Sequence, residues 1–209
     1  MISLDKVHAC AKIYDITYTS YAHEVHVSML CGLLFDELHS LFPTYTIQER
    51  DILICAGLLH DIGNSRGIKG HHKASYELIH MEGEKNQHFG LSHDSLEIVA
   101  LIARYHRKAV PSMNHEAYAI LSSEAQERVR KLSALLRIAD GLDYLHDQAI
   151  SKLTCTIQDT WIECQCTSNN DWSLMNNMAR AKEKAEPLSE EFQKQIRFYG
   201  VSHRCATKK

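Results

Sequence analysis

Apolar residues recur every three or four positions through most of residues 20–147, which is the period of helices that bury one face. The 209 residues include only three prolines and nine glycines, so few positions interrupt such helices. The pattern therefore predicts a mainly α-helical fold. The expected helices lie near residues 20–40, 48–61, 72–82, 92–108 and 124–147.

The pattern changes after about residue 150. Apolar and polar residues alternate over 153–158 and again over 162–166, with Asp159-Thr160 between the two runs. A period of two is typical of strands with one buried face, so these runs predict a β-hairpin. A charged helix is expected over 173–186, a short helix from Pro187 to Phe198, and then a frayed tail. The expected domains are a helical domain, 1–148, and a small β-hairpin-plus-helix appendage packed on it, 149–209.

Composition excludes several classes of protein. A net charge of −3 gives no basic surface for a nucleic acid duplex or an anionic membrane. No apolar run approaches the roughly 20 residues that span a bilayer, and charged residues in the first twenty positions argue against a signal peptide. The seven cysteines lie mostly in apolar segments, which favours free thiols in a reducing compartment. We therefore expect a cytoplasmic protein.

Ionisable residues share the apolar stripes of four predicted helices. They are His23, His60, His106 and Asp140, and Asp61 follows His60 directly. A single buried histidine is usually an ordinary hydrogen-bonded core residue. Burying several such groups, carboxylates above all, is costly unless each has a partner, a proton or a metal ion. A mixed set of imidazoles and carboxylates suits Fe, Mn, Zn or Co better than Ca²⁺.

The order H…HD…D, formed by His23, His60-Asp61 and Asp140, resembles the signature of the HD superfamily of metal-dependent phosphohydrolases. His71 and His106 resemble the two extra histidines of its two-metal members. Over roughly residues 20–198, the chain is most similar to the C-terminal HD region of the exopolyphosphatase/guanosine pentaphosphate phosphohydrolase family. The similar stretches are AGLLHDIG, GHHKASYELI, ALIARYHRKAVP and LLRIADGLDYLH.

In that family, hydrolysis of polyphosphate or pentaphosphate belongs to N-terminal domains of the actin-like ATPase type. Only about 20 residues precede His23, so we expect a stand-alone HD region without those domains. The resemblance therefore implies an HD-domain helical bundle and an activity of the HD site itself. It does not transfer the activity for which the family is named.

Three ligand positions have competing candidates. His23 is preferred because it shares the stripe of Val27 and resembles the family pattern of a histidine four residues before valine. His71 is preferred because it lies four residues before Ser75, where relatives commonly have a small residue. Asp140 is preferred for its place in RIADGLD. The alternatives are His26 for His23, His72 for His71, and Asp143 for Asp140.

The resemblance implies that Asp61 bridges two metal ions, and that a water activated by both ions attacks phosphorus. Two aspartates leave such a site positively charged, which suits a phosphate group. Arg107 and Lys108 flank His106 and are the basic residues most expected to contact it. The implied ligand sets are His23, His60 and Asp140 for one ion, and His71 and His106 for the other; further basic candidates are Arg66, Lys69 and Arg104.

These observations predict a phosphohydrolase with one or two divalent ions, drawn from Fe, Mn, Zn, Co and Mg. Its expected partner is a phosphorylated small molecule, in particular a nucleotide, with no membrane or nucleic acid duplex involved. A homodimer is left open. The alternative is a non-catalytic module that binds a nucleotide or protein and keeps the metal site for regulation. The intact His60-Asp61 pair argues against that alternative.

Overall fold

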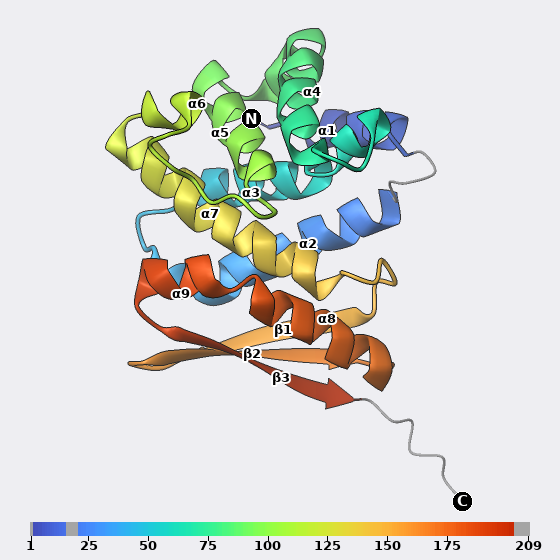
Figure 1. Cartoon of the computed structure of the whole chain (residues 1–209), viewed down its shortest axis with the longest axis vertical. Helices are drawn as coiled ribbons and strands as arrows, with labels where there is room; N and C mark the ends of the chain where they lie inside the picture. Colours follow the sequence, from blue (N-terminus) through green and yellow to red (C-terminus); the bar gives the residue numbers. More distant parts are fainter. Residues whose placement is uncertain (1, 16–20, 203–209) are drawn as a thin grey trace, which may run out of the picture.

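The computed structural model describes residues 2–15 and 21–202 (Figure 1). Within these ranges the chain is mainly α-helical with a small C-terminal sheet, which confirms the predicted fold class. None of its helices there is both long and apolar enough to cross a membrane. The helices are α1 (Leu4–Ile13), α2 (Tyr21–Leu38), η1 (His39–Leu41), α3 (Ile47–Leu59), η2 (Ile62–Arg66), α4 (His71–Lys85), η3 (Gln87–Gly90), α5 (His93–Arg104), α6 (Glu116–Ala119), α7 (Ser123–Leu142), α8 (Asp171–Glu183) and α9 (Glu186–Phe192).

Helices α2, α3, α5 and α7 pack around one apolar core. Each contributes side chains that are fully buried, such as Leu30, Leu59, Ile102 and Leu136. Helix α1, which the sequence analysis did not predict, packs against α3. The side chains that cause the helical period in the sequence are therefore the ones that form the core.

Local sequence sets where α3 begins and ends. Thr46 caps its first turn, because its hydroxyl accepts from Gln48 N at 3.2 Å while the Glu49 carboxylate accepts from Thr46 N at 2.7 Å. The helix ends at Leu59. The backbone then tightens into η2, so His60 and Asp61 lie at the junction of two helical segments.

The strands are β1 (Ile150–Ile157), β2 (Trp161–Ser168) and β3 (Gln195–Ser202), in the order β1-β2-β3. The first two are antiparallel, with Cys155 opposite Cys164, which confirms the hairpin. The predicted helix from Pro187 to Phe198 is wrong beyond Phe192. The chain there enters β3, which pairs with β2 in parallel and places Ile196 beside Ile162. The expected frayed tail lies almost wholly outside the described residues.

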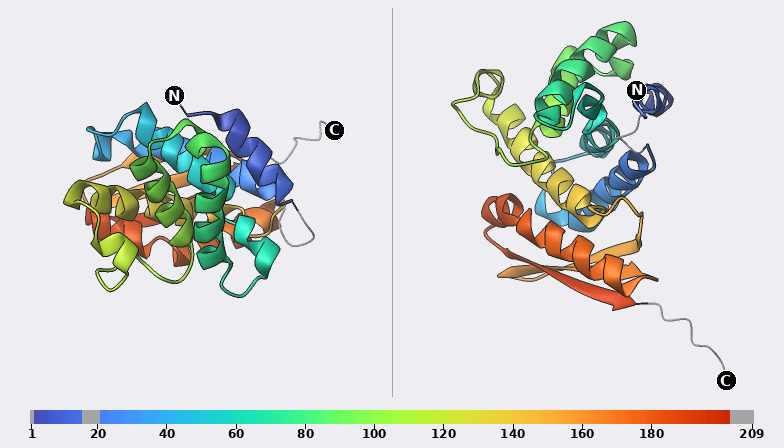
Figure 2. Two further views of the ribbon diagram at one scale, coloured as in Figure 1. Left: turned by 90° about the horizontal axis from the view of Figure 1, so that it is seen from above. Right: turned by 45° about the vertical axis from the view of Figure 1, so that its right-hand side comes forward.

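Together β1, β2, α8, α9 and β3 are called the C-terminal module here. Helix α8 contacts β2 and β3 on one side and α7 on the other. It lies between the sheet and α7 in Figure 1 and in the right-hand view of Figure 2. Gly200 of β3 faces α8, where a Cβ would lie 2.9 Å from the side-chain ends Leu174 Cδ2 and Met178 Cε.

Candidate metal centre

Five elements bring the predicted ligands to one end of the bundle. His23 lies in the first turn of α2, His60 and Asp61 follow α3, and Asp140 lies in the last turn of α7. His71 begins α4 and His106 follows α5. The side chains form two groups that could each hold a metal ion. These are His23, His60 and Asp140, and Asp61, His71 and His106.

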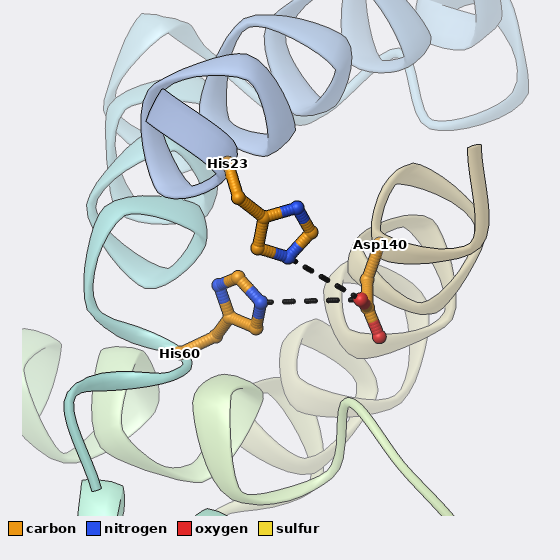
Figure 3. Close-up of side chains that lie close together, drawn as sticks. All are labelled: His23, His60 and Asp140. Carbon is orange, nitrogen blue, oxygen red and sulfur yellow. Dashed lines mark ion pairs between the residues drawn. The ribbon is translucent and has the colours of Figure 1, made fainter. Parts of the chain in front are cut away.

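In the first group, two imidazoles face one carboxylate oxygen. Asp140 Oδ1 lies 3.7 Å from His23 Nε2 and 4.0 Å from His60 Nε2. Figure 3 shows the three side chains pointing toward one another from α2, the end of α3 and α7. Both Nε2 atoms are buried and have no hydrogen-bond partner among the described residues. A buried polar atom without a partner costs free energy of folding, so the two nitrogens and the carboxylate that face one another fit a bound cation.

The second group surrounds Asp61. Its Oδ1 lies 3.0 Å from His71 Nε2 and 3.4 Å from His106 Nε2. The two Nε2 atoms are themselves 3.1 Å apart. Asp61 Oδ1 also lies 3.8 Å from His60 Nε2, so Asp61 connects the second group to the first. This is the placement that a bridging carboxylate would require.

The outer nitrogens of all four imidazoles are held by hydrogen bonds, and His71 Nδ1 donates to Ile68 O at 2.9 Å. His60 Nδ1 donates to Gly57 O at 2.8 Å, and His106 Nδ1 donates to Ala103 O at 2.6 Å. His23 Nδ1 donates to Asp143 Oδ2 at 2.8 Å. A carbonyl oxygen can only accept, so the proton sits on Nδ1 and the Nε2 lone pair faces the centre. Metal-binding histidines commonly have such outer partners.

At Asp61, Asp140 and His106, burial and neighbouring charges together favour the protonation states that metal ligands need. The pKa of His23 is raised instead, because the effect of burial is outweighed by the hydrogen bond to Asp143 and by the charges of the neighbouring aspartates. Burial raises the pKa of Asp61, but His60, His71 and His106 outweigh it and hold that pKa well below its usual range. Burial likewise opposes ionisation of Asp140, whose pKa is nevertheless lowered by Lys184 and the surrounding histidines. Burial lowers the pKa of His106 to about 3. The carboxylates are therefore ionised, and the imidazole of His106 is neutral, at neutral pH.

The alternative ligands that the sequence offered, His26, His72 and Asp143, lie outside both metal-binding groups. His26 Nδ1 faces Asp143 Oδ1 at 3.1 Å, and its Nε2 lies 2.8 Å from Ile150 O of β1. Asp143 is fully buried between His23 and His26, where it orients His23 from behind. His72 belongs to neither group. The sequence analysis preferred Asp140 to Asp143, and the structure shows that Asp143 is an outer partner of His23.

His146 is a further neighbour that the sequence analysis missed. Its ring stacks on that of His23, with centroids 3.8 Å apart and an interplanar angle of 1°. His146 follows α7, four residues beyond its end. The HDQ stretch in which it lies carries no helical period, so only the fold brings it to the centre.

A cleft of about 520 Å³ is lined by the whole second group and, from the first group, by Asp140. Arg107 and Lys108 line it, as the sequence predicted for the phosphate contact. Arg66 and Arg104 do not line it: Arg66 pairs with Glu77 at 2.7 Å, and Arg104 lies over the Tyr76 ring at 5.3 Å. Lys69 is likewise outside the cleft lining. The cations that sequence reasoning missed are Arg137 of α7, Arg180 of α8 and Lys184 just after α8.

Comparison with known proteins agrees with this architecture. The family model of the Ppx/GppA phosphatase, domain III, matches residues 5–188. No curated protein matches the chain. The matched segment contains all six residues of the two groups and most of the C-terminal module. The chain therefore belongs to the Ppx/GppA phosphatase domain III family.

Proposed function

We propose that this protein is a metal-dependent phosphohydrolase that cleaves a phosphoester or phosphoanhydride, and that its substrate is a nucleotide. One observation carries the proposal: two His/Asp groups are connected through Asp61, and Asp61, His71, His106 and Asp140 line a cleft with basic walls. The membership of a phosphatase family supports the same reaction class.

The proposed ligands are His23, His60 and Asp140 for one ion, and Asp61, His71 and His106 for another, with Asp61 as the bridge. When bound, the ions would lower the pKa of a water molecule and neutralise charge on phosphoryl oxygens. The protein's part is to hold the donor atoms in place. Four imidazoles among six ligands favour Fe, Mn, Zn or Co over Mg.

Basic and apolar side chains of the cleft suit the two parts of a nucleotide. Arg107 can fork onto phosphoryl oxygens and Lys108 can act as a point charge, since both line the cleft beside His106. Tyr144 and Ile68 line the same cleft and are 46% and 57% exposed. They offer apolar surface for a base.

The test is hydrolysis of a nucleotide panel by the purified chain loaded with Mn, Fe, Co, Zn or Mg. We expect Asp61→Asn to lower turnover at least about 100-fold, because even outer partners of metal ligands are worth 10–100-fold. Asp36→Asn is the control, since Asp36 is half exposed and pairs only with Arg50 among the described residues. Full turnover by Asp61→Asn would refute the proposal. Tight nucleotide binding without turnover under any metal would refute it in favour of a regulatory module.

A further inference from the structure

We propose that the C-terminal module completes the cleft with a second phosphate-binding subsite, formed by Arg180 and Lys184, and that the preferred substrate therefore carries two adjacent phosphoryl groups. The inference rests on the proposed function, which assigns the first phosphoryl group to the metal centre. The ligand class is a diphosphate, either free or as part of a nucleotide.

Helix α8 approaches α7 so closely that only glycine fits at the contact. A Cβ at Gly141 would lie 2.6 Å from Ala181 Cα and 2.9 Å from Ala181 N. Gly141 directly follows Asp140, and Arg180 directly precedes Ala181. The contact therefore fixes the backbone beside Arg180 next to the backbone of a proposed metal ligand.

A second contact fixes α8 to the loop after α7. Asn177 is fully buried, and its Oδ1 accepts from Leu145 N at 3.1 Å. Its Nδ2 donates to Asp147 Oδ1 at 3.3 Å. Arg180 thus projects from a helix that is held at two places, and sites on such elements are more precise than sites on loops.

Arg180 and Lys184 both line the cleft. Lys184 Nζ forms an ion pair with Asp140 Oδ2, while Oδ1 of the same carboxylate faces His23 and His60. The Arg180 guanidinium lies 4.2 Å from the centroid of the Tyr144 ring. Lys184 therefore sits at the edge of the metal centre, and Arg180 sits beside the proposed base surface.

These cations lie apart from the pair predicted by sequence. Arg107 and Lys108 follow α5, whereas Arg180 and Lys184 come from α8 and the residue after it. Helix α7 runs between α5 and α8 (Figure 1). A ligand with two linked phosphoryl groups would engage the basic residues contributed from both sides of the cleft.

The charge balance of the cleft agrees with a polyanionic ligand. Among the described lining residues, five are Lys or Arg and three are Asp or Glu. One of the five, Arg137, is buried and donates to Tyr105 O at 3.0 Å, so it serves the fold. Glu183 forms an ion pair with Arg180, but its side chain is 63% exposed, so the pair contributes little stability. The Arg180 guanidinium can exchange this partner for a bidentate hydrogen bond to a phosphate group.

The test is calorimetric binding of methylenediphosphonate, which cannot be hydrolysed, and of methylphosphonate. The full chain is loaded with Mn²⁺ and freed of excess metal. We expect the wild type to prefer the diphosphonate, and Arg180→Ala to lower that preference about tenfold, the value of one charge-assisted hydrogen bond. Lys182→Ala is the matched control, since Lys182 is exposed on the same helix and does not line the cleft.

Lys184→Met should lower the preference as well, with metal content measured because Lys184 contacts Asp140. Arg180 belongs to neither metal-binding group, so Arg180→Ala tests the phosphate subsite even if Lys184→Met loses metal. An unchanged diphosphonate preference in Arg180→Ala would overturn the subsite, whatever the chain hydrolyses. A preference that depends on Arg180, with no turnover under any metal, would support the subsite while refuting the proposed function.

Discussion

Ser75 connects two of the three segments that carry the second metal-binding group, those of Asp61 and His71. Its hydroxyl donates to His60 O at 2.6 Å and accepts from Gly63 N at 2.9 Å. Ser75 is fully buried in α4, the helix that begins with His71. We predict that Ser75→Ala destabilises the fold and weakens metal binding, because both backbone groups lose this partner.

The expected loss follows from burial. His60 and Gly63 are both buried, so water cannot easily replace the missing hydroxyl. Each unsatisfied buried group costs about 1–3 kcal/mol, so the two groups together cost about 2–6 kcal/mol. This is a large share of the roughly 5–15 kcal/mol by which a typical domain is stable.

Urea unfolding followed by circular dichroism measures the effect. With a slope of about 2–3 kcal/mol per M, the midpoint of Ser75→Ala should fall by about 1–3 M. Ser65→Ala is the control, because the partly exposed Ser65 hydroxyl donates only to Ile62 O, at 2.7 Å. A Ser75→Ala midpoint no lower than that of Ser65→Ala would refute the reasoning.

Three further changes test separate parts of the account. Gly141→Ala should push α8 away from α7, because its Cβ would lie 2.6 Å from Ala181 Cα. Calorimetry should then show no preference for the diphosphonate. An unchanged preference would count against the subsite. Asp143→Asn removes the charged partner of His23 and should lower the metal affinity about 10–100-fold, as measured by competition with a chelator. An unaltered metal affinity would contradict this role of Asp143. Burial raises the pKa of Glu24 from 4.5 to about 9, so the folded protein holds a proton that the unfolded chain releases, and stability falls as pH rises through that window. In urea unfolding, the stability of Glu24→Gln relative to the wild type should therefore increase as the pH rises from 4.5 to about 9. A stability difference that does not depend on pH would disprove this prediction.

Periodicity predicted the long helices because each buries a long stripe of side chains. It missed α1, whose buried face consists only of Val7, Cys10 and Ala11. It also missed β3, although Ile196 and Phe198 alternate with polar or exposed neighbours. That strand is stabilised by parallel pairing with β2, which begins 34 residues earlier (195 − 161), and no local pattern encodes such a pairing.

The residues of the metal centre and its cleft likewise include some that the sequence reveals and some that only the structure reveals. Residues such as His60 and Asp61 stand out locally, because polar groups on an apolar stripe need a partner. Arg180 and Lys184 look like ordinary charges of a solvated helix, and only the packing of α8 against Gly141 brings them to the cleft. The outer role of Asp143 is likewise visible only from its contact with His23.

The central claim is that the cleft holds two metal ions, and anomalous diffraction from crystals of the Mn²⁺-loaded chain tests it most directly. The account predicts two peaks, each about 2.0–2.3 Å from its ligand atoms. One peak should lie among His23, His60 and Asp140, and the other among Asp61, His71 and His106. A map with fewer than two peaks in the cleft, or with peaks only elsewhere on the chain, would contradict this claim.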